Sequence, residues 1–219
     1  MRKLLTSQDG RFVVVNSEPE MASDLEAIQS AAFPTLAADE LMRREHYLSH
    51  LRVFPQGQHA VMERASGKVV ACSTDMRTRV DFAHYQHRYI EVVANNYLTN
   101  HDPAGDWLYG ADIGVHPDYR GFGLSKLLYQ ARHNLIRQLG LKGHVAGAMP
   151  KGFGAVKDQM PIEQYVQKVV RGELSDPVLS VQLKRGYAVW GIMTDYLDDP
   201  SCGNYGVFIV WRNPGVRSW

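Results

Sequence analysis

The segment from Arg120 to Ser125 has residue types and spacing that suit it to binding a phosphate group. Arg120 supplies a positive charge, and Gly121 and Gly123 lack the Cβ atoms that would keep a ligand away from the backbone. A helical pattern begins near Leu124, and the N–H groups of a helix's first turn have no partner within the helix and carry the positive end of its dipole. Together these features predict a cradle for a pyrophosphate group.

Two other phosphate-binding motifs do not fit this segment. It lacks the Gly-Lys-Ser/Thr ending of a P-loop. The dinucleotide fingerprint requires three glycines and an acidic residue about 20 positions later, and no such unit follows. From the local residues alone, a strand–helix turn that needs glycine only for its geometry stays an alternative.

A strand and a helix must position the segment. The apolar run Leu108–Val115 predicts a strand, which Pro117 stops. The following residues repeat leucine and alanine at spacings near 3.6 as far as Leu139, which predicts an amphipathic helix that ends at Gly140.

The remaining sequence alternates strand and helix patterns, without repeats or low-complexity tracts. Strands are predicted at Phe12–Val15, His59–Arg64, Val69–Met76, His144–Met149, Tyr187–Thr194 and Tyr205–Arg212. Helices are predicted at about 23–32, 39–51, 162–170 and 176–183. Residues 78–106 are aromatic, histidine-rich and irregular, which predicts a substrate-side lid or an oligomer contact, with an insertion that has no role as the alternative. Periodicity by itself gives only a mixed α/β class.

Residues 115–125 resemble motif A of the GNAT superfamily of acyl-CoA-dependent N-acetyltransferases, whose pattern is Arg/Gln-x-x-Gly-x-Gly/Ala. Arg120 and Gly123 match the pattern, and Ser125 stands where glycine or alanine is usual. Serine is small, and its hydroxyl can bond a phosphate or cap the helix. The resemblance implies an α/β fold with a mixed, mostly antiparallel sheet flanked by helices, formed by residues 1–219 as a single domain with an irregular insertion at about 78–106.

The same resemblance implies acetyl-CoA, or another acyl-CoA, as co-substrate. The pyrophosphate would lie on the 120–125 loop, and the pantetheine arm would pair with the central strand where two parallel strands splay apart. Gly114 and Gly147 would keep side chains out of the way, with a bulge or close packing as the alternative reason for either glycine. The implied CoA contacts are Ile113, Gly114, Val115, Arg120, Gly121, Phe122, Gly123, Leu124 and Ser125.

N-acetyl transfer requires a neutral amine. An alkyl ammonium with a pKa of about 10.4 is neutral at pH 7 in only about one molecule in 2,500. Asp112, on the predicted central strand, is therefore nominated as the base or as an anchor for the substrate ammonium. A structural carboxylate is the alternative for Asp112, and Glu91 is a weaker rival for the base.

The departing CoA thiolate needs a proton or a hydrogen bond. Many GNAT members use a tyrosine four residues before the glycine of a Gly-Phe/Tyr pair, and here that position, before Gly186, is Gln182. Tyr165 is the nominated substitute, although its place on an apolar helical stripe also suits a core residue. Tyr187 and Tyr109 are alternatives, and water is another because a free thiol has a pKa near 8.5.

Further segments, at 108–113, 145–147, 158–160, 163–166 and 172–179, resemble the GNAT domains that are fused to nitrilase-like amidohydrolases. The hydrolase would need several hundred further residues, so a stand-alone relative is expected. A homodimer, or an amidohydrolase partner docked on the insertion, is left open. So is a CoA-binding or partner-interaction module that has lost transfer activity.

Composition excludes several other classes of protein. Lys plus Arg number 24 against 23 acidic residues, so no strong field favours nucleic acid or a membrane. Cys72 and Cys202 make no disulfide framework, and no signal-peptide core or apolar span of about 18 residues occurs, which predicts a cytoplasmic protein.

The histidine pairs at 46/50 and 84/87 lack the spacing of a zinc site, so no metal is expected. The sequence thus predicts direct transfer of an acyl group from acyl-CoA to a small-molecule or peptide amine.

Overall fold

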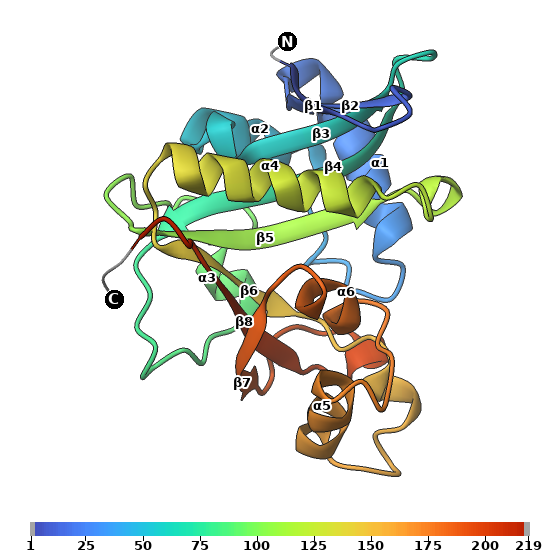
Figure 1. Ribbon diagram of the computed structural model, residues 1–219, viewed down its shortest axis with the longest axis vertical. Helices are drawn as coiled ribbons and strands as arrows, with labels where there is room; N and C mark the ends of the chain where they lie inside the picture. The colour runs from blue at the N-terminus through green and yellow to red at the C-terminus, as the bar shows by residue number, and fades with distance from the viewer. Residues whose placement is uncertain (1–2, 217–219) are drawn as a thin grey trace.

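The eight strands found within residues 3–216 join one sheet, in the order β1-β2-β3-β4-β5-β6-β8-β7 (Figure 1). The computed structural model describes residues 3–216. The strands are β1 (Lys3–Thr6), β2 (Phe12–Asn16), β3 (Gln58–Glu63), β4 (Val69–Thr78), β5 (Trp107–Val115), β6 (Gly143–Ala148), β7 (Ala188–Met193) and β8 (Gly206–Arg212). Within the described residues β5 and β6 are the parallel pair and the other neighbours are antiparallel. The predicted mixed, mostly antiparallel sheet is confirmed.

Helices cover both faces of this sheet. They are α1 (Ala22–Ala32), α2 (Arg44–Val53), α3 (Tyr89–Val92), α4 (Leu124–Gln138), α5 (Ile162–Val170) and α6 (Leu179–Leu183). In Figure 1, α4 crosses in front of the sheet, α1 and α2 lie behind it, and α5 and α6 stand beside β6 and β8. Between residues 3 and 216, no helix is both long and apolar enough to span a membrane.

The apolar stripe of α4 packs as its 3.6-residue period predicts. Leu124, Leu128 and Ala131 are buried against a cluster from β2, β3 and β4 that includes Phe12 and Val70. Each large aliphatic side chain buried in this way contributes roughly 1.5–3 kcal/mol to the free energy of folding. This packing fixes the start of α4 at one end of β5.

The insertion between β4 and β5 is part of the core. Tyr89, Val93 and Leu98 are buried in one cluster with residues of the sheet and of α1 and α2. The buried Asn96 side chain accepts from the Tyr89 hydroxyl at 3.0 Å and donates to the main-chain oxygen of Glu40 at 3.0 Å. The aromatic composition of the insertion therefore reflects its packing over the sheet.

Several element limits differ from the sequence prediction. Strand β1 and helix α3 were not predicted, because each is short and has no clear periodicity. The last helix, predicted from residue 176, begins at Leu179 because Asp176 Oδ1 accepts from the Val178 and Leu179 amides before the first turn. The second helix begins at Arg44, where the predicted start was residue 39.

Candidate active site

The loop before α4 presents free backbone amides at the surface. Gly121 and Gly123 have φ angles of +87° and +73°, which other residues rarely adopt, and open space surrounds the position of a Cβ at each. Gly123 is the N-cap of α4. Among the described residues, the amides of 121–125 have no acceptor, and residues 120–123 are exposed. The loop therefore has the open, donor-rich form that a phosphate group needs.

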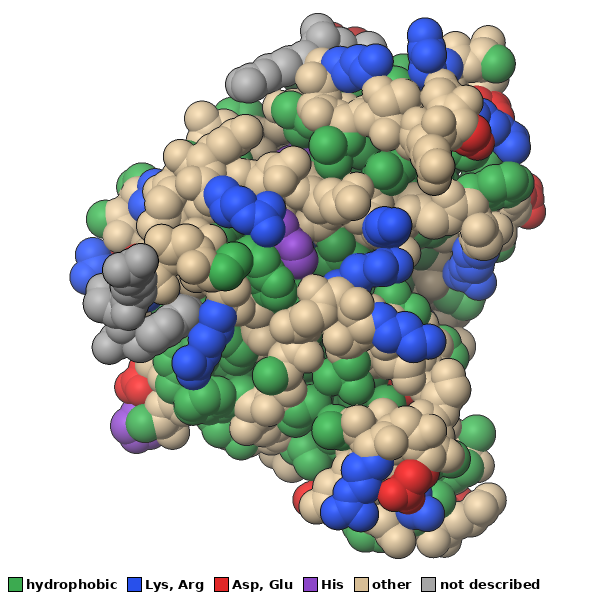
Figure 2. Space-filling model, in the orientation of Figure 1, with side chains coloured by type: hydrophobic (Ala, Val, Ile, Leu, Met, Phe, Trp, Pro, Cys, Tyr) green, Lys and Arg blue, Asp and Glu red, His purple; other side chains and the backbone are tan. Residues whose placement is uncertain are grey.

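The charges around this loop favour an anion. The first turn of α4 contains Lys126 and no acidic residue. Figure 2 shows lysine and arginine side chains gathered over the region between the start of α4 and α6. These cations reinforce the positive end of the helix dipole.

Strands β5 and β6 diverge next to the loop. Their pairing runs from Trp107 and Gly143 to Gly110 and Ala146, after which each strand continues with its other neighbour. Figure 1 shows the resulting V between the two strands, open toward the start of α4. The edge of β5 beyond Gly110 thus has main-chain groups that β6 does not occupy.

A bulge in β5 sets the direction of Asp112. Thr74 of β4 pairs with Asp112, and the next residue, Asp75, pairs with Gly110, so Ala111 has no partner. The extra residue reverses the alternation of side chains along β5. Asp112 consequently faces the α1 layer, where its Oδ2 lies 3.8 Å from Cys72 Sγ.

Asp112 is almost fully buried, with 6% of its surface exposed. The Gln29 amide, in the orientation that satisfies its neighbours, donates to Asp112 Oδ2 at 3.1 Å. Burial raises the pKa of Asp112 to about 7, against the opposing effect of the Arg132 charge. A carboxyl group with this pKa can hold or release a proton near neutral pH.

Three side chains that are distant in sequence meet beside the V. The Tyr109 hydroxyl lies 3.0 Å from the Tyr196 hydroxyl and 2.9 Å from His87 Nε2. The Tyr196 ring crosses β6 at Gly147, where a Cβ would overlap it. Close packing, the alternative raised for this glycine, therefore applies.

Gly114 also faces a packed layer, since a Cβ there would lie 3.3 Å from Ile28 Cγ2. Tyr196 was not predicted as a site residue, because it lies in the loop after β7 and belongs to no sequence motif. The Tyr196 ring packs against Gly147 of β6 and Gly206 of β8, and these contacts form only in the folded protein.

Tyr165 lies in a different neighbourhood. Its hydroxyl donates to Asp176 Oδ2 at 2.8 Å, and its ring packs on Phe153. The structure joins Tyr165 to the start of α6 and does not bring it to Asp112. Its role as the acid stays a prediction.

Gln182 is buried, and within residues 3–216 its Oε1 atom has no hydrogen-bond partner.

A buried ion pair lies under α4, on the other face of the sheet. Arg132 Nε is 2.9 Å from Asp75 Oδ1, and His144 Nε2 is 3.1 Å from the same oxygen. Burial alone would raise the pKa of Asp75, but Arg132 and His144 outweigh it and lower that pKa. Arg132 also donates to the main-chain oxygens of Thr74 and Asp112. This pair therefore ties α4 to the bulge that orients Asp112.

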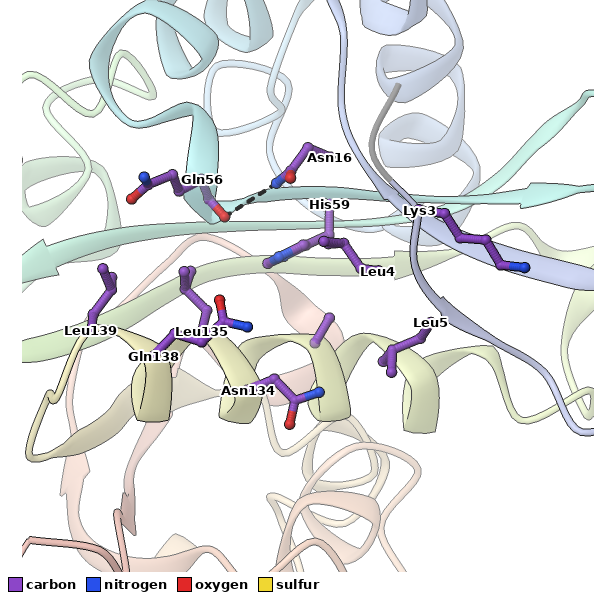
Figure 3. A pocket seen from close by; sticks show the side chains of 11 residues that line it. Lys3, Leu4, Leu5, Asn16, Gln56, His59, Asn134, Leu135, Gln138 and Leu139 are labelled. Carbon is purple, nitrogen blue, oxygen red and sulfur yellow. Dashed lines mark hydrogen bonds between the residues drawn. The ribbon is translucent and has the colours of Figure 1, made fainter.

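A separate cavity of about 180 Å³ lies between α4 and strands β1–β3 (Figure 3). Its walls include the amide side chains of Asn16, Gln56, Asn134 and Gln138, with His59 between them. On α4 it reaches residues 131–138, the half of the helix away from the 120–125 loop. Across residues 3–216, no three His, Cys, Asp or Glu side chains come together as a metal site would require.

Two curated relatives from Bacillus subtilis (strain 168) are similar to this chain. "Probable hydrolase YhcX" is 31% identical over 95% of the chain, and the chain spans 40% of that protein's length. "Uncharacterized N-acetyltransferase YkwB" is 29% identical over 96% of the chain and 95% of its own length. No family model matches the chain.

Solved structures match the whole architecture. The loading GNATL domain of CurA from Lyngbya majuscula has a TM-score of 0.80 at 17% identity, covering 94% of this chain and 99% of its own. The GphF GNAT-like decarboxylase in complex with isobutyryl-CoA has a TM-score of 0.77 at 21% identity, covering 91% and 98%. The chain has the GNAT acyltransferase fold.

A putative acetyltransferase from Salmonella typhimurium, yncA with acetyl-CoA, shares the GNAT fold at a TM-score of 0.58 and 13% identity, over 95% of this chain and 97% of its own. The fold implied by the resemblance of residues 115–125 is thereby confirmed. The narrower subgroup, GNAT domains fused to amidohydrolases, stays a prediction.

Proposed function

We propose that the protein is an N-acyltransferase that moves an acetyl or other acyl group from acyl-CoA to a primary amine. The observation that carries the proposal is the row of unpaired amides at residues 121–125, at the open start of α4 and beside the diverging strands β5 and β6. Similar proteins with this fold are named as acetyltransferases or described as bound to acyl-CoA, which supports the same donor.

We assign the donor to the residues that the sequence predicts. Arg120 and the amides of Gly121 to Ser125 hold the pyrophosphate group, and the edge of β5 at Ile113–Val115 binds the pantetheine arm. On this proposal residues 1–219 act as one catalytic domain, which is supported by the single sheet that the strands of residues 3–216 share.

The reaction joins the amine nitrogen to the thioester carbonyl carbon. The carbon–sulfur bond breaks, its electron pair stays on sulfur, and the nitrogen gives up a proton. The carboxylate of Asp112 attracts the ammonium form of the substrate and so helps to bind it on this face of the sheet. The alternative was a CoA-binding module without transfer activity. The similar proteins carry the names of enzymes, which favours an enzyme over such a module.

Calorimetric titration with acetyl-CoA, followed by a free-thiol assay over a panel of amines, tests the proposal. We expect saturable binding and amine-dependent thiol release. An absence of heat at saturating acetyl-CoA would contradict the CoA site. Binding without thiol release for any amine would contradict transfer.

A second candidate function is decarboxylation of a 2-carboxyacyl-CoA. It is favoured by the similarity to GphF, which is described as a GNAT-like decarboxylase and has one of the two higher TM-scores. In that reaction the carbon–carbon bond breaks, carbon dioxide leaves, and the thioester enolate takes a proton. Malonyl-CoA without an amine distinguishes the two, because decarboxylation yields acetyl-CoA under these conditions, whereas transfer requires an amine and leaves malonyl-CoA unchanged.

A further inference from the structure

The cluster of Tyr196, Tyr109 and His87 forms a continuous chain of hydrogen bonds from the V to the surface. Its members come from the loop after β7, from β5 and from the insertion. Tyr196 and Tyr109 are each 2% exposed, so water does not compete for their hydroxyls. His87 is half-buried.

The direction of each hydrogen bond follows from the chemistry of the groups. His87 Nδ1 lies 2.8 Å from the main-chain oxygen of Tyr85, which can only accept, so Nδ1 carries the proton. In the neutral ring Nε2 is then an acceptor, and the Tyr109 hydroxyl donates to it. The single Tyr109 proton is thereby used, so Tyr196 is the donor to Tyr109.

The inner end of this chain lies where the thioester is expected. The Tyr196 hydroxyl lies against the backbone of Gly147, where a Cβ would overlap it. Gly147 is one residue beyond Ala146, the last residue of β6 that pairs with β5. The Tyr196 oxygen therefore reaches the point where the two strands diverge.

The outer end of the chain meets a cavity of about 140 Å³ under the insertion. Tyr109 and His87 line it, together with Tyr85, Val145 and Phe208. Arg79, Asp81 and His84 also line it, and Glu91 on α3 acts on His87 electrostatically. Asp81 and His84 are exposed, so the cavity connects His87 to solvent.

We propose that Tyr196, Tyr109 and His87 form a proton relay that deprotonates the attacking amine. The inference rests on the proposed transferase function. As the carbon–nitrogen bond forms, the amine proton moves to the Tyr196 oxygen, the Tyr196 proton to the Tyr109 oxygen, and the Tyr109 proton to His87 Nε2. His87 becomes an imidazolium ion and releases its proton through the cavity.

The protonation states at rest suit this direction of transfer. Burial lowers the pKa of His87, so the ring is neutral at pH 7 and can accept a proton. Burial also raises the pKa of Tyr109 and of Tyr196, so both phenols keep a proton to pass on. Because the relay takes the proton that the neutral amine loses on attack, Asp112 is left the role of attracting the ammonium form, which first loses one proton to solvent.

Tyr109→Phe interrupts the relay while both of its ends remain. We expect kcat to fall by about 10²-fold or more, with acetyl-CoA affinity unchanged. We also expect the acidic limb of the kcat–pH profile, which His87 sets, to disappear in Tyr109→Phe and in His87→Gln. Tyr129→Phe, which removes a buried hydroxyl on the α4 face, is the matched control, with kcat changed less than threefold. Wild-type kcat and pH profile in Tyr109→Phe would overturn the relay.

A second measurement is independent of turnover. Nitrogen NMR of labelled histidine should show the Nδ1–H tautomer for His87 in the wild type. Loss of the Tyr109 donor should raise the His87 pKa, because that hydrogen bond favours the neutral ring. An Nε2–H tautomer, or an unchanged pKa in Tyr109→Phe, would overturn the relay. If no amine supports transfer while these NMR results hold, the proposed function fails and the hydrogen-bond chain stands.

Discussion

Tyr109 and Asp112 point to the same face of β5, although three positions separate them in a strand whose side chains alternate. The cause is the unpaired Ala111 opposite the step from Thr74 to Asp75. A regular strand would direct Asp112 toward α4 and away from the tyrosines. The bulge thus gathers the carboxyl group and the phenol at the opening between β5 and β6.

Replacing Asp112 with Asn should change how stability depends on pH. The folded-state pKa of about 7 lies above the ordinary 3.8, so between these values the native protein binds a proton that the unfolded chain has lost. Stability therefore falls as pH rises through this window, by up to roughly 4 kcal/mol at completion. Asp112→Asn removes this loss, and urea unfolding at pH 5 and pH 8 measures it.

Other groups titrate in the same range, so the difference between variant and wild type is the informative quantity. Burial lowers the pKa of His50 and of His59 to about 4, which removes stability as pH falls. Both variant and wild type contain these histidines. The exposed Asp24→Asn is the matched control and should leave the pH dependence unchanged. Parallel stability curves for wild type and Asp112→Asn would show that Asp112 ionises normally.

The same substitution separates two roles of Asp112 in catalysis. An ammonium anchor contributes to substrate binding, so we expect the KM for the amine to rise about tenfold or more and kcat to change less than threefold. Steady-state kinetics with acetyl-CoA at saturation give both values. A loss confined to kcat would instead assign the proton transfer to Asp112.

Gly123→Ala should weaken acetyl-CoA binding more than it weakens the fold. A residue with a Cβ is strained by about 1 kcal/mol at a φ of +73°, and the methyl group would occupy the space that a phosphate needs. We expect at least a tenfold loss of affinity by calorimetry. Gly140→Ala imposes similar strain at a φ of +65° at the other end of α4, so it should cost similar stability without loss of affinity. Equal affinities for both variants would argue against the phosphate cradle.

Arg132→Ala should destabilise the protein by about 3–5 kcal/mol, because it leaves the buried Asp75 carboxylate without its counter-charge. Chemical unfolding measures this loss. Arg137→Ala, on an exposed position of the same helix, should cost less than about 1 kcal/mol. Similar losses in the two variants would mean that the Asp75–Arg132 pair contributes little to folding.

Local pattern was sufficient for the elements whose periodicity is strong. The stripe of α4, the apolar run of β5 and the glycines at 121 and 123 are properties of neighbouring residues, so the predicted strand, loop and helix agree with the structure. Strand β1 and helix α3 could not be predicted from local pattern, because each is short and its conformation depends on the residues that pack against it.

The sequence by itself determined the main strands and helices in their order along the chain and the glycine loop before α4, since these follow from residue type and spacing. The GNAT arrangement of these elements was implied by the resemblance of residues 115–125. Tertiary structure decided which side chains share the site. An unpaired Ala111 reverses the face of Asp112, and the packing of distant segments joins His87 and Tyr196 to Tyr109 while Asp176 holds Tyr165 elsewhere. Bulges and long-range contacts depend on strand pairing, which no local spacing specifies.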